Sequence, residues 1–273
     1  KKDPTMADAK PTAHVPAAGK IVFAHRGLNH QAPENTMPAF QLAADSGVEW
    51  IETDVDILKD GTAVILHDST LDRTTNMSGS MYLFTVEDLP SIDAGAKFGK
   101  GYEGTPIPTL DDLIDFLNRN QINANIEIKP HEAGEAGTMK LIDQVITALE
   151  KLDPEREVIV SSFSSLTLER FHQKAPQYAI AQLFDRYTLR PEWLSVLEMV
   201  GATYIHVEDA DPLSDDGLKE EYVRAFLDAG YGVNVWTVND PKRAQELFDW
   251  GVTGVFSDVA DELLETSADE SPA

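Results

Sequence analysis

The chain contains 273 residues, enough for one large domain or two small ones with a sizeable hydrophobic core. Hydrophobic residues make up 42% and charged residues 25%, which excludes collagen-like, coiled-coil and wholly disordered chains. The 22 Lys and Arg against 47 Asp and Glu give a net charge of −25, and such a surface repels nucleic-acid phosphates and anionic lipid headgroups. We therefore expect no nucleic-acid partner and no stable membrane insertion.

The two ends of the chain differ in composition from the middle. Residues 1–5 precede Met6 and are interpreted as a cloning remnant within a flexible N-terminal arm, 1–19, and residues 265–273 are predicted as a flexible tail. The segment between them, 20–264, is predicted to form a single domain. Because no apolar signal-peptide core follows Met6, we expect a cytoplasmic location, or a secreted or periplasmic one if a signal peptide was removed.

Strand-like and helix-like segments alternate along this domain. The predicted strands are Ile21–Ala24, Trp50–Val55, Asn123–Ile128, Val158–Ser161, Ala179–Leu183, Tyr204–Val207, Gly232–Val238 and Gly254–Phe256. The predicted helices are Met37–Ser46, Leu110–Asn118, Gly137–Leu152, Ser165–Lys174, Pro191–Met199, Leu218–Ala229 and Pro241–Asp249. This alternation over about 250 residues is typical of a (β/α)8 (TIM) barrel. A doubly wound open sheet is the alternative, but no glycine-rich phosphate-binding turn follows the first strand.

One irregularity follows the second predicted strand. The turn signal Lys59-Asp60-Gly61 precedes a short apolar segment, Ala63–Leu66, which indicates a hairpin rather than a helix. Residues 69–108 contain several glycines and little helical periodicity. They are predicted as a small insertion after the second strand.

The first predicted strand ends in His25-Arg26-Gly27, where a barrel would place catalytic side chains. Histidine transfers protons near neutral pH, arginine binds phosphate or carboxylate through two hydrogen bonds, and glycine permits a tight turn. Taken alone, the tripeptide is equally well explained as an ordinary loop.

Carboxylates alternate with apolar residues along the second strand. Glu52 and Asp54 share one face, while Ile51 and Val55 occupy the face that would pack against helices. Two inward carboxylates repel each other unless a cation lies between them, which favours a metal site.

The next strand continues this pattern with Glu127 and Lys129. A third carboxylate beside the first two completes an all-oxygen site that suits Mg²⁺ or Ca²⁺ better than Zn²⁺. Lys129 would add positive charge without being a ligand. A simple Glu127–Lys129 ion pair is the alternative interpretation.

Two further side chains are candidates for the same rim. His67 follows the hairpin, and together with His25 it could supply a general acid and a general base. Trp236 either lines a binding pocket or plugs the barrel. Among the other histidines, only His206 is predicted to face inward.

At this point the motifs resemble the glycerophosphodiester phosphodiesterases. The matching segments are His25-Arg26-Gly27, Pro33-Glu34-Asn35-Thr36, Glu52-Thr53-Asp54, His67-Asp68-x-x-Leu71-x-Arg73-Thr74, Glu127-Ile128-Lys129 and Trp236-Thr237-Val238-Asn239. Together they are highly specific, and most of them fall in the first half of the barrel. The short insertion is similar to that of the compact cytosolic bacterial branch.

The resemblance implies a barrel that hydrolyses glycerophosphodiesters, such as glycerophosphocholine or glycerophosphoethanolamine, to sn-glycerol 3-phosphate and an alcohol. It implies His25 and His67 as the catalytic acid–base pair, and one divalent cation, Mg²⁺ or Ca²⁺, held by Glu52, Asp54 and Glu127. In the family, the glycerol 2-hydroxyl is thought to attack phosphorus and form a cyclic phosphate.

The same resemblance implies binding and supporting roles. Arg26 and Lys129 would contact the phosphate, and Trp236 the glycerol side of the substrate. Glu34 and Asn35 would support the site, and Asn35 or Thr36 is expected to cap the following helix.

Three alternatives use the same residues differently. The first is proton abstraction next to a carboxylate with Lys129 as base, which leaves the two histidines without a role. The second is a barrel that binds phosphodiesters without turnover, although such proteins usually lose an acid, a base or a ligand. The third is a phosphodiesterase acting on intact (lyso)phospholipids, for which the insertion offers only residues 81–84 as an apolar contact. The sequence does not identify the alcohol group of the substrate, the choice between Mg²⁺ and Ca²⁺ or the oligomeric state.

Overall fold

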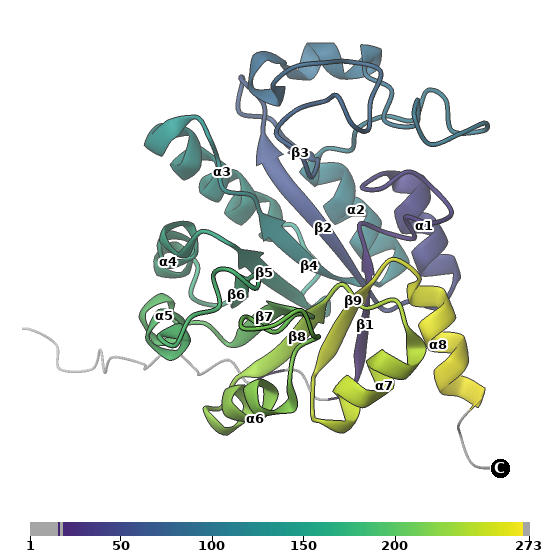
Figure 1. Cartoon of the computed structure of the whole chain (residues 1–273). Coiled ribbons are helices and arrows are strands. Elements are labelled where there is room, and N and C mark those ends of the chain that lie inside the picture. Colours follow the sequence, from purple (N-terminus) through teal and green to yellow (C-terminus); the bar gives the residue numbers. More distant parts are fainter. Residues whose placement is uncertain (1–15, 17–18, 270–273) are drawn as a thin grey trace, which may run out of the picture.

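The computed structural model describes residue 16 and residues 19–269. Its nine-stranded sheet has the order β1-β9-β8-β7-β6-β5-β4-β2-β3, and β1 also pairs with β2, which closes the parallel strands into a barrel (Figure 1). The strands are β1 (Ile21–His25), β2 (Trp50–Ile57), β3 (Ala63–Ile65), β4 (Asn123–Ile128), β5 (Val158–Ser162), β6 (Ala179–Phe184), β7 (Tyr204–Glu208), β8 (Gly232–Trp236) and β9 (Gly254–Ser257). The predicted (β/α)8 barrel is confirmed.

Helices surround the barrel on its outer side (Figure 1). They are α1 (Met37–Asp45), α2 (Leu110–Asn120), α3 (Gly134–Leu149), α4 (Ser165–Lys174), α5 (Trp193–Val200), α6 (Glu220–Asp228), α7 (Pro241–Asp249) and α8 (Ala260–Asp269). Within the described part of the chain, no helix combines the length and the apolar character needed to cross a bilayer.

Helix α8 was missing from the predicted elements. It extends the domain past residue 264, so the predicted tail, 265–273, begins as helix. Leu263 is buried against the barrel, and Asp261 and Glu262 lie in the first helical turn, where negative charge is favourable. Residues 270–273 lie outside the described residues, as does nearly all of the predicted arm, 1–19, including 1–5.

Side chains alternate between the two faces of the barrel wall. Outward residues such as Ile51 and Val55 pack with the helices in a large apolar cluster. A second cluster fills the barrel interior towards the end at which the strands begin. It consists of Ile21, Phe23, Trp50, Ile159, Ala181, Tyr204 and Phe256. Within it the rings of Phe23 and Phe256 stack with centroids 4.3 Å apart. This plug separates the end of the barrel at which the strands terminate from the end at which they begin.

The hairpin and the insertion lie beside β2. Strand β3 runs antiparallel to it, with Ile65 opposite Val55 and Ala63 opposite Ile57, so the predicted hairpin is confirmed. The insertion contains two 3₁₀ helices, η1 (Met81–Leu83) and η2 (Val86–Ser91), and forms a lobe beyond one edge of the barrel (Figure 1). Apolar side chains including Leu71 and Met81 give this lobe its own small core.

Candidate active site

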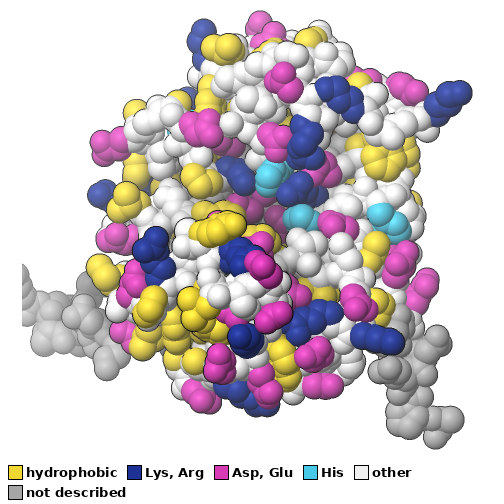
Figure 2. Space-filling model, viewed as in Figure 1, with side chains coloured by type: hydrophobic (Ala, Val, Ile, Leu, Met, Phe, Trp, Pro, Cys, Tyr) yellow, Lys and Arg dark blue, Asp and Glu magenta, His cyan; other side chains and the backbone are white. Residues whose placement is uncertain are grey.

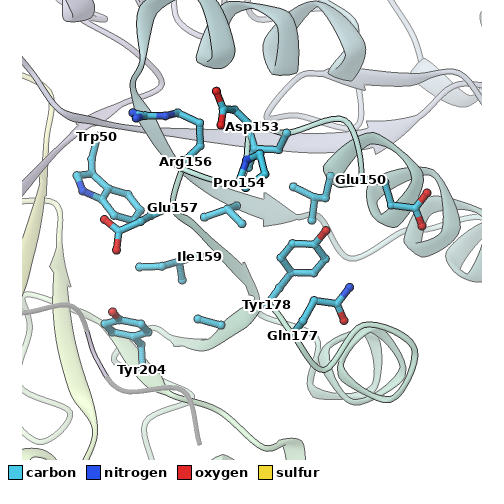
Figure 3. A pocket seen from close by; sticks show the side chains of 14 residues that line it. Trp50, Glu150, Asp153, Pro154, Arg156, Glu157, Ile159, Gln177, Tyr178 and Tyr204 are labelled. Carbon is cyan, nitrogen blue, oxygen red and sulfur yellow. The ribbon is translucent and has the colours of Figure 1, made fainter. Parts of the chain in front are cut away.

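Two cavities lie at opposite ends of the barrel. One, about 410 Å³, lies where strands begin, between Trp50, Arg156 and Tyr204 (Figure 3). The other, about 280 Å³, lies where strands end and is lined by His25, Arg26, Glu52, His67, Asn125, Glu127, Ser161, Phe163, Leu183, His206, Trp236, Thr237 and Phe256. TIM barrels carry their catalytic groups at this second position. The smaller cavity is therefore the candidate active site.

His25 ends β1 and is held by a carboxylate from the far end of the chain. Its Nδ1 lies 2.8 Å from Asp258 Oδ1, and its Nε2 lies 3.7 Å from Glu52 Oε2. Asn29 Nδ2 also donates to Asp258, at 2.6 Å. Burial alone would raise the pKa of Asp258, but these hydrogen bonds lower it well below its usual range. Asp258 was not among the predicted site residues.

Arg26 and Gly27 form a sharp turn between β1 and α1. Both have positive φ, 58° and 80° respectively, and a Cβ on Gly27 would lie 2.7 Å from the carbonyl carbon of Ala39. The turn directs the Arg26 guanidinium to Glu34, with which it forms an ion pair, and brings its Nε within 3.7 Å of Asp54 Oδ2. Glu34 thus holds the side chain predicted to contact phosphate.

Asn35 lies between this turn and the acidic residues of β2. Its Nδ2 donates to Asp54 Oδ2 at 3.0 Å, and its Oδ1 accepts from Thr53 Oγ1 at 2.9 Å. The expectation that Asn35 or Thr36 caps α1 is wrong. Thr36 lies at the N-cap position, but its hydroxyl donates to Pro33 O at 2.6 Å instead, and the Asn35 side chain is already engaged with β2.

Glu52, Asp54 and Glu127 form a buried acidic triad. They offer ligand atoms that all lie within 4.8 Å of one another, and Asp54 Oδ1 has no hydrogen-bond partner among the described residues. Burial, followed by repulsion from Asp54, raises the pKa of Glu127 to about 8 and that of Glu52 well above its usual value. Crowded, desolvated carboxylates with an unused oxygen fit a divalent cation.

Lys129 follows β4 and belongs to the same cluster. Its Nζ donates to Glu127 Oε1 at 3.2 Å, so the ion pair considered as an alternative exists alongside the triad rather than in place of it. Burial opposes the charge of Lys129, but Glu127 and Asp54 outweigh burial and raise its pKa. The lysine is therefore charged beside the cavity.

His67 reaches the same rim through the hairpin. Leu66 N donates to Asp54 O at 3.2 Å, which places His67 close to the acidic residues of β2. His67 Nδ1 lies 2.6 Å from Asp68 Oδ1, and Arg73 Nε donates to Asp68 Oδ2 at 2.8 Å. Burial lowers the pKa of His67, so its ring is neutral at neutral pH. His67 thus repeats the arrangement of His25, with one ring nitrogen held by a carboxylate.

The later strands supply an uncharged wall. Trp236 on β8 lines the cavity and also packs against the apolar plug below it, and its ring packs edge-on against Phe163 at a centroid distance of 5.9 Å. Leu183 and Phe256 continue this wall, and His206 on β7 lies fully buried beside it, as predicted for an inward histidine. Figure 2 shows histidine and basic side chains near the middle of this face, with acidic side chains both among them and over the rest of the surface. Basic side chains are thus available beside the acidic triad.

The fold and the site together define a TIM-barrel enzyme whose cavity combines basic side chains, carboxylates and histidines. Residues 25–262 match the model of the glycerophosphoryl diester phosphodiesterase family, which covers most of the chain. The chain belongs to this family.

Individual relatives agree over nearly their full length. The chain is 33% identical to the glycerophosphodiester phosphodiesterase of Caldanaerobacter subterraneus over 245 residues, which cover 89% of this chain and 96% of the relative. It is 32% identical to the enzyme of the same name from Bacillus altitudinis over 244 residues, with 89% and 96% covered. A phosphodiesterase of Oleispira antarctica, solved with the product sn-glycerol-3-phosphate, superposes with a TM-score of 0.83 at 30% identity and covers 92% of this chain and 97% of its own.

Proposed function

We propose that this phosphodiesterase hydrolyses glycerophosphodiesters, such as glycerophosphocholine and glycerophosphoethanolamine, to sn-glycerol 3-phosphate and an alcohol in the cavity described above. One observation carries the proposal: the acidic triad lies next to two histidines, each with a ring nitrogen held by a carboxylate. The Oleispira antarctica structure, with its bound product, supports the choice of substrate class.

Glu52, Asp54 and Glu127 would hold one divalent cation. All of their donor atoms are carboxylate oxygens, which suits Mg²⁺ or Ca²⁺. When bound, the cation would neutralise charge on the phosphate oxygens and so lower the barrier to attack. Asn35, through its hydrogen bond to Asp54 Oδ2, keeps one of these carboxylates in place.

Arg26 and Lys129, which each lie next to a carboxylate of the triad, would bind the anionic phosphate. Their side chains are only 17% and 18% exposed, so both would carry their charge at positions shielded from the acidic surface. Glu34 fixes the direction of the Arg26 side chain, which restricts the phosphate to one orientation.

The two histidines would transfer the protons. With Nδ1–H donated to Asp258 or Asp68, His25 and His67 each present Nε2 as the ring nitrogen that can exchange a proton with the substrate. One ring removes the proton from the attacking hydroxyl, and the other, in its protonated form, supplies a proton to the departing alcohol.

The glycerol 2-hydroxyl is the proposed nucleophile, giving a cyclic phosphate that water then opens. Because this hydroxyl belongs to the same molecule as the phosphorus, the step is effectively unimolecular, which can contribute roughly 7–11 kcal/mol. A 2-deoxy analogue of glycerophosphocholine should therefore bind as a competitive inhibitor with very low kcat, whereas equal kcat values would exclude the cyclic intermediate.

The activity itself is tested with a panel of glycerophosphodiesters, by measuring the release of sn-glycerol 3-phosphate with and without a chelator. Turnover that disappears with chelator and returns with Mg²⁺ or Ca²⁺ is expected. Binding of the substrates without release would instead indicate a non-catalytic barrel, and release only from intact lysophospholipids would indicate the lipid-directed alternative.

A further inference from the structure

We infer that His206 binds the primary hydroxyl of the substrate's glycerol and selects substrates that carry it, an inference that rests on the function proposed above. His206 lies on β7 and is fully buried. It contributes to the cavity lining one layer above the apolar plug, where its ring meets the edge of Phe256 at a centroid distance of 5.1 Å. It therefore forms part of the cavity floor.

The hydrogen bonds around His206 fix which ring nitrogen carries the hydrogen. Thr253 Oγ1, which has a single hydrogen to donate, lies 2.7 Å from Asn234 Oδ1 and 2.8 Å from Val233 O, and the amide nitrogen of Asn234 is on the side of His206. Asn234 Nδ2 then donates to His206 Nε2 at 2.9 Å. Burial lowers the pKa of His206 to about 3, so the ring is neutral. A neutral ring that accepts at Nε2 carries its hydrogen on Nδ1.

That Nδ1–H group is buried and has no hydrogen-bond partner among the described residues. Buried donors are almost always paired, so an unpaired one that contributes to a cavity indicates a ligand. Besides Arg26 Nε, which lies 3.7 Å from Asp54 Oδ2, two further unpaired polar atoms belong to residues lining the same cavity, Asn125 Oδ1 and Trp236 Nε1. The first is an acceptor and the second a donor.

A hydroxyl-bearing ligand suits this combination. A hydroxyl group both donates and accepts, so it can pair with His206 Nδ1–H and still donate to an acceptor such as Asn125 Oδ1. A phosphate would leave the Asn125 oxygen without a donor, and an alkyl chain would leave all three atoms unpaired. The floor therefore suits a polyol.

The glycerol moiety is the part of the substrate that fits here. The plug closes the bottom of the cavity. The alcohol part of the substrate differs in size from one substrate to another and must therefore extend toward the open rim. The glycerol part, which is the same in every substrate, then occupies the floor. Its 2-hydroxyl is used in the proposed attack, which leaves the primary hydroxyl for His206. Glycerol is also small enough for a cavity of about 280 Å³.

The test compares two substrates in matched variants. The first substrate is glycerophosphocholine, and the second is the choline phosphodiester of propane-1,2-diol joined through its primary oxygen, which keeps the nucleophile and lacks only the hydroxyl at issue. The wild type should prefer the first in kcat/KM by about 10- to 100-fold, the usual effect of leaving one buried donor unpaired.

In His206→Phe this preference should fall to near one, and His206→Gln, which retains a donor, should restore part of it. His172→Phe makes the same exchange on α4, outside the barrel wall, and should keep the wild-type ratio. A His206→Phe variant that discriminates as strongly as the wild type overturns the inference.

A second measurement needs neither turnover nor a folded variant. In the ¹⁵N-histidine spectrum of the wild type, sn-glycerol 3-phosphate should shift the Nδ1 signal of His206, and propane-1,2-diol 1-phosphate should leave it unchanged. Equal effects of the two ligands contradict the inference. A selective shift in a protein that hydrolyses no glycerophosphodiester contradicts the proposed function and leaves this inference standing.

Discussion

At the scale of single residues, the site contains two histidines, His25 and His67, and each is oriented by a carboxylate that contacts one of its ring nitrogens. Truncation of either ring should therefore affect the chemical step more than binding. We expect His25→Ala and His67→Ala each to lower kcat by about a hundredfold or more with a much smaller change in KM. Steady-state kinetics on glycerophosphocholine provide the measurement. A variant that retains near wild-type kcat would show that its histidine is not the acid or the base.

Asp258 is predicted to act by positioning His25. Asp258→Asn removes the charged acceptor of the His25 Nδ1–H and should lower kcat by about tenfold or more while leaving KM nearly unchanged. Asp261→Asn is a matched control, because Asp261 forms a comparable pair with His30, at 2.9 Å, that lies on the exterior. Equal losses of kcat in Asp258→Asn and Asp261→Asn would show that Asp258 has a structural role only.

The sequence located most of this site because its chemistry is concentrated in short motifs. The inward pair Glu52 and Asp54 follows from strand alternation alone, and the structure places both in the triad. Asp258 escaped because its partner lies 233 positions earlier in the chain, and its neighbours form no motif around it. Its place directly after β9, at the end of a barrel strand, is the signal that could have identified it.

At the scale of elements, the turn between β1 and α1 positions both His25 and Arg26. We expect Gly27→Ala to destabilise the fold and to reduce activity, because a Cβ there meets the Ala39 backbone in addition to the unfavourable φ of 80°. The loss should be at least about 1–3 kcal/mol. Chemical denaturation and kcat are the two measurements.

The control for this substitution is Gly47→Ala. Gly47 has a similar φ of 84°, but a Cβ there has no neighbour within 4 Å in the described structure. It therefore isolates the cost of the backbone conformation, and Gly27→Ala should be more destabilising. If Gly27→Ala lowered the free energy of unfolding less than Gly47→Ala does, the turn would accommodate the added Cβ without loss of stability.

Helices and strands were predictable from the sequence where apolar residues recur at a regular spacing, and they were missed where this regularity is weak. The hairpin that carries His67 was predictable because a turn signal separates two apolar segments. Helix α8 was not, since its sequence is acidic and serine-containing, and it is anchored by burial of residues such as Leu263, which only the assembled barrel provides. Tertiary packing decides such marginal helices.

At the scale of the whole molecule, stability should depend on pH through the acidic triad. Without a cation, burial and the charge of Asp54 raise the pKa of Glu127 from 4.5 to about 8. The folded protein therefore binds a proton that the unfolded chain releases, and this stabilisation is complete below about pH 4.5 and is lost as the pH rises through about 8. The Tm of the chelated protein should accordingly fall across this interval.

Two comparisons isolate the cause. Glu127→Gln should flatten this part of the curve of Tm against pH, because the titrating group is gone. Addition of Mg²⁺ or Ca²⁺ should raise the Tm most at high pH, where the carboxylates are ionised and bind the cation best. The triad would have no part in cation binding if Tm were the same with chelator and with saturating cation at every pH.

The closed barrel also separates two tasks along the chain. The ionisable groups of the cavity come mainly from β1, β2, the hairpin and β4, whereas β5 to β9 contribute largely neutral side chains such as Phe163, Leu183 and Trp236. We therefore expect substitutions of these neutral side chains to change which molecules fit more than they change the ionisable groups of the cavity. New specificities should arise mainly through the second half of the barrel, with Asp258, which contacts His25, as the exception.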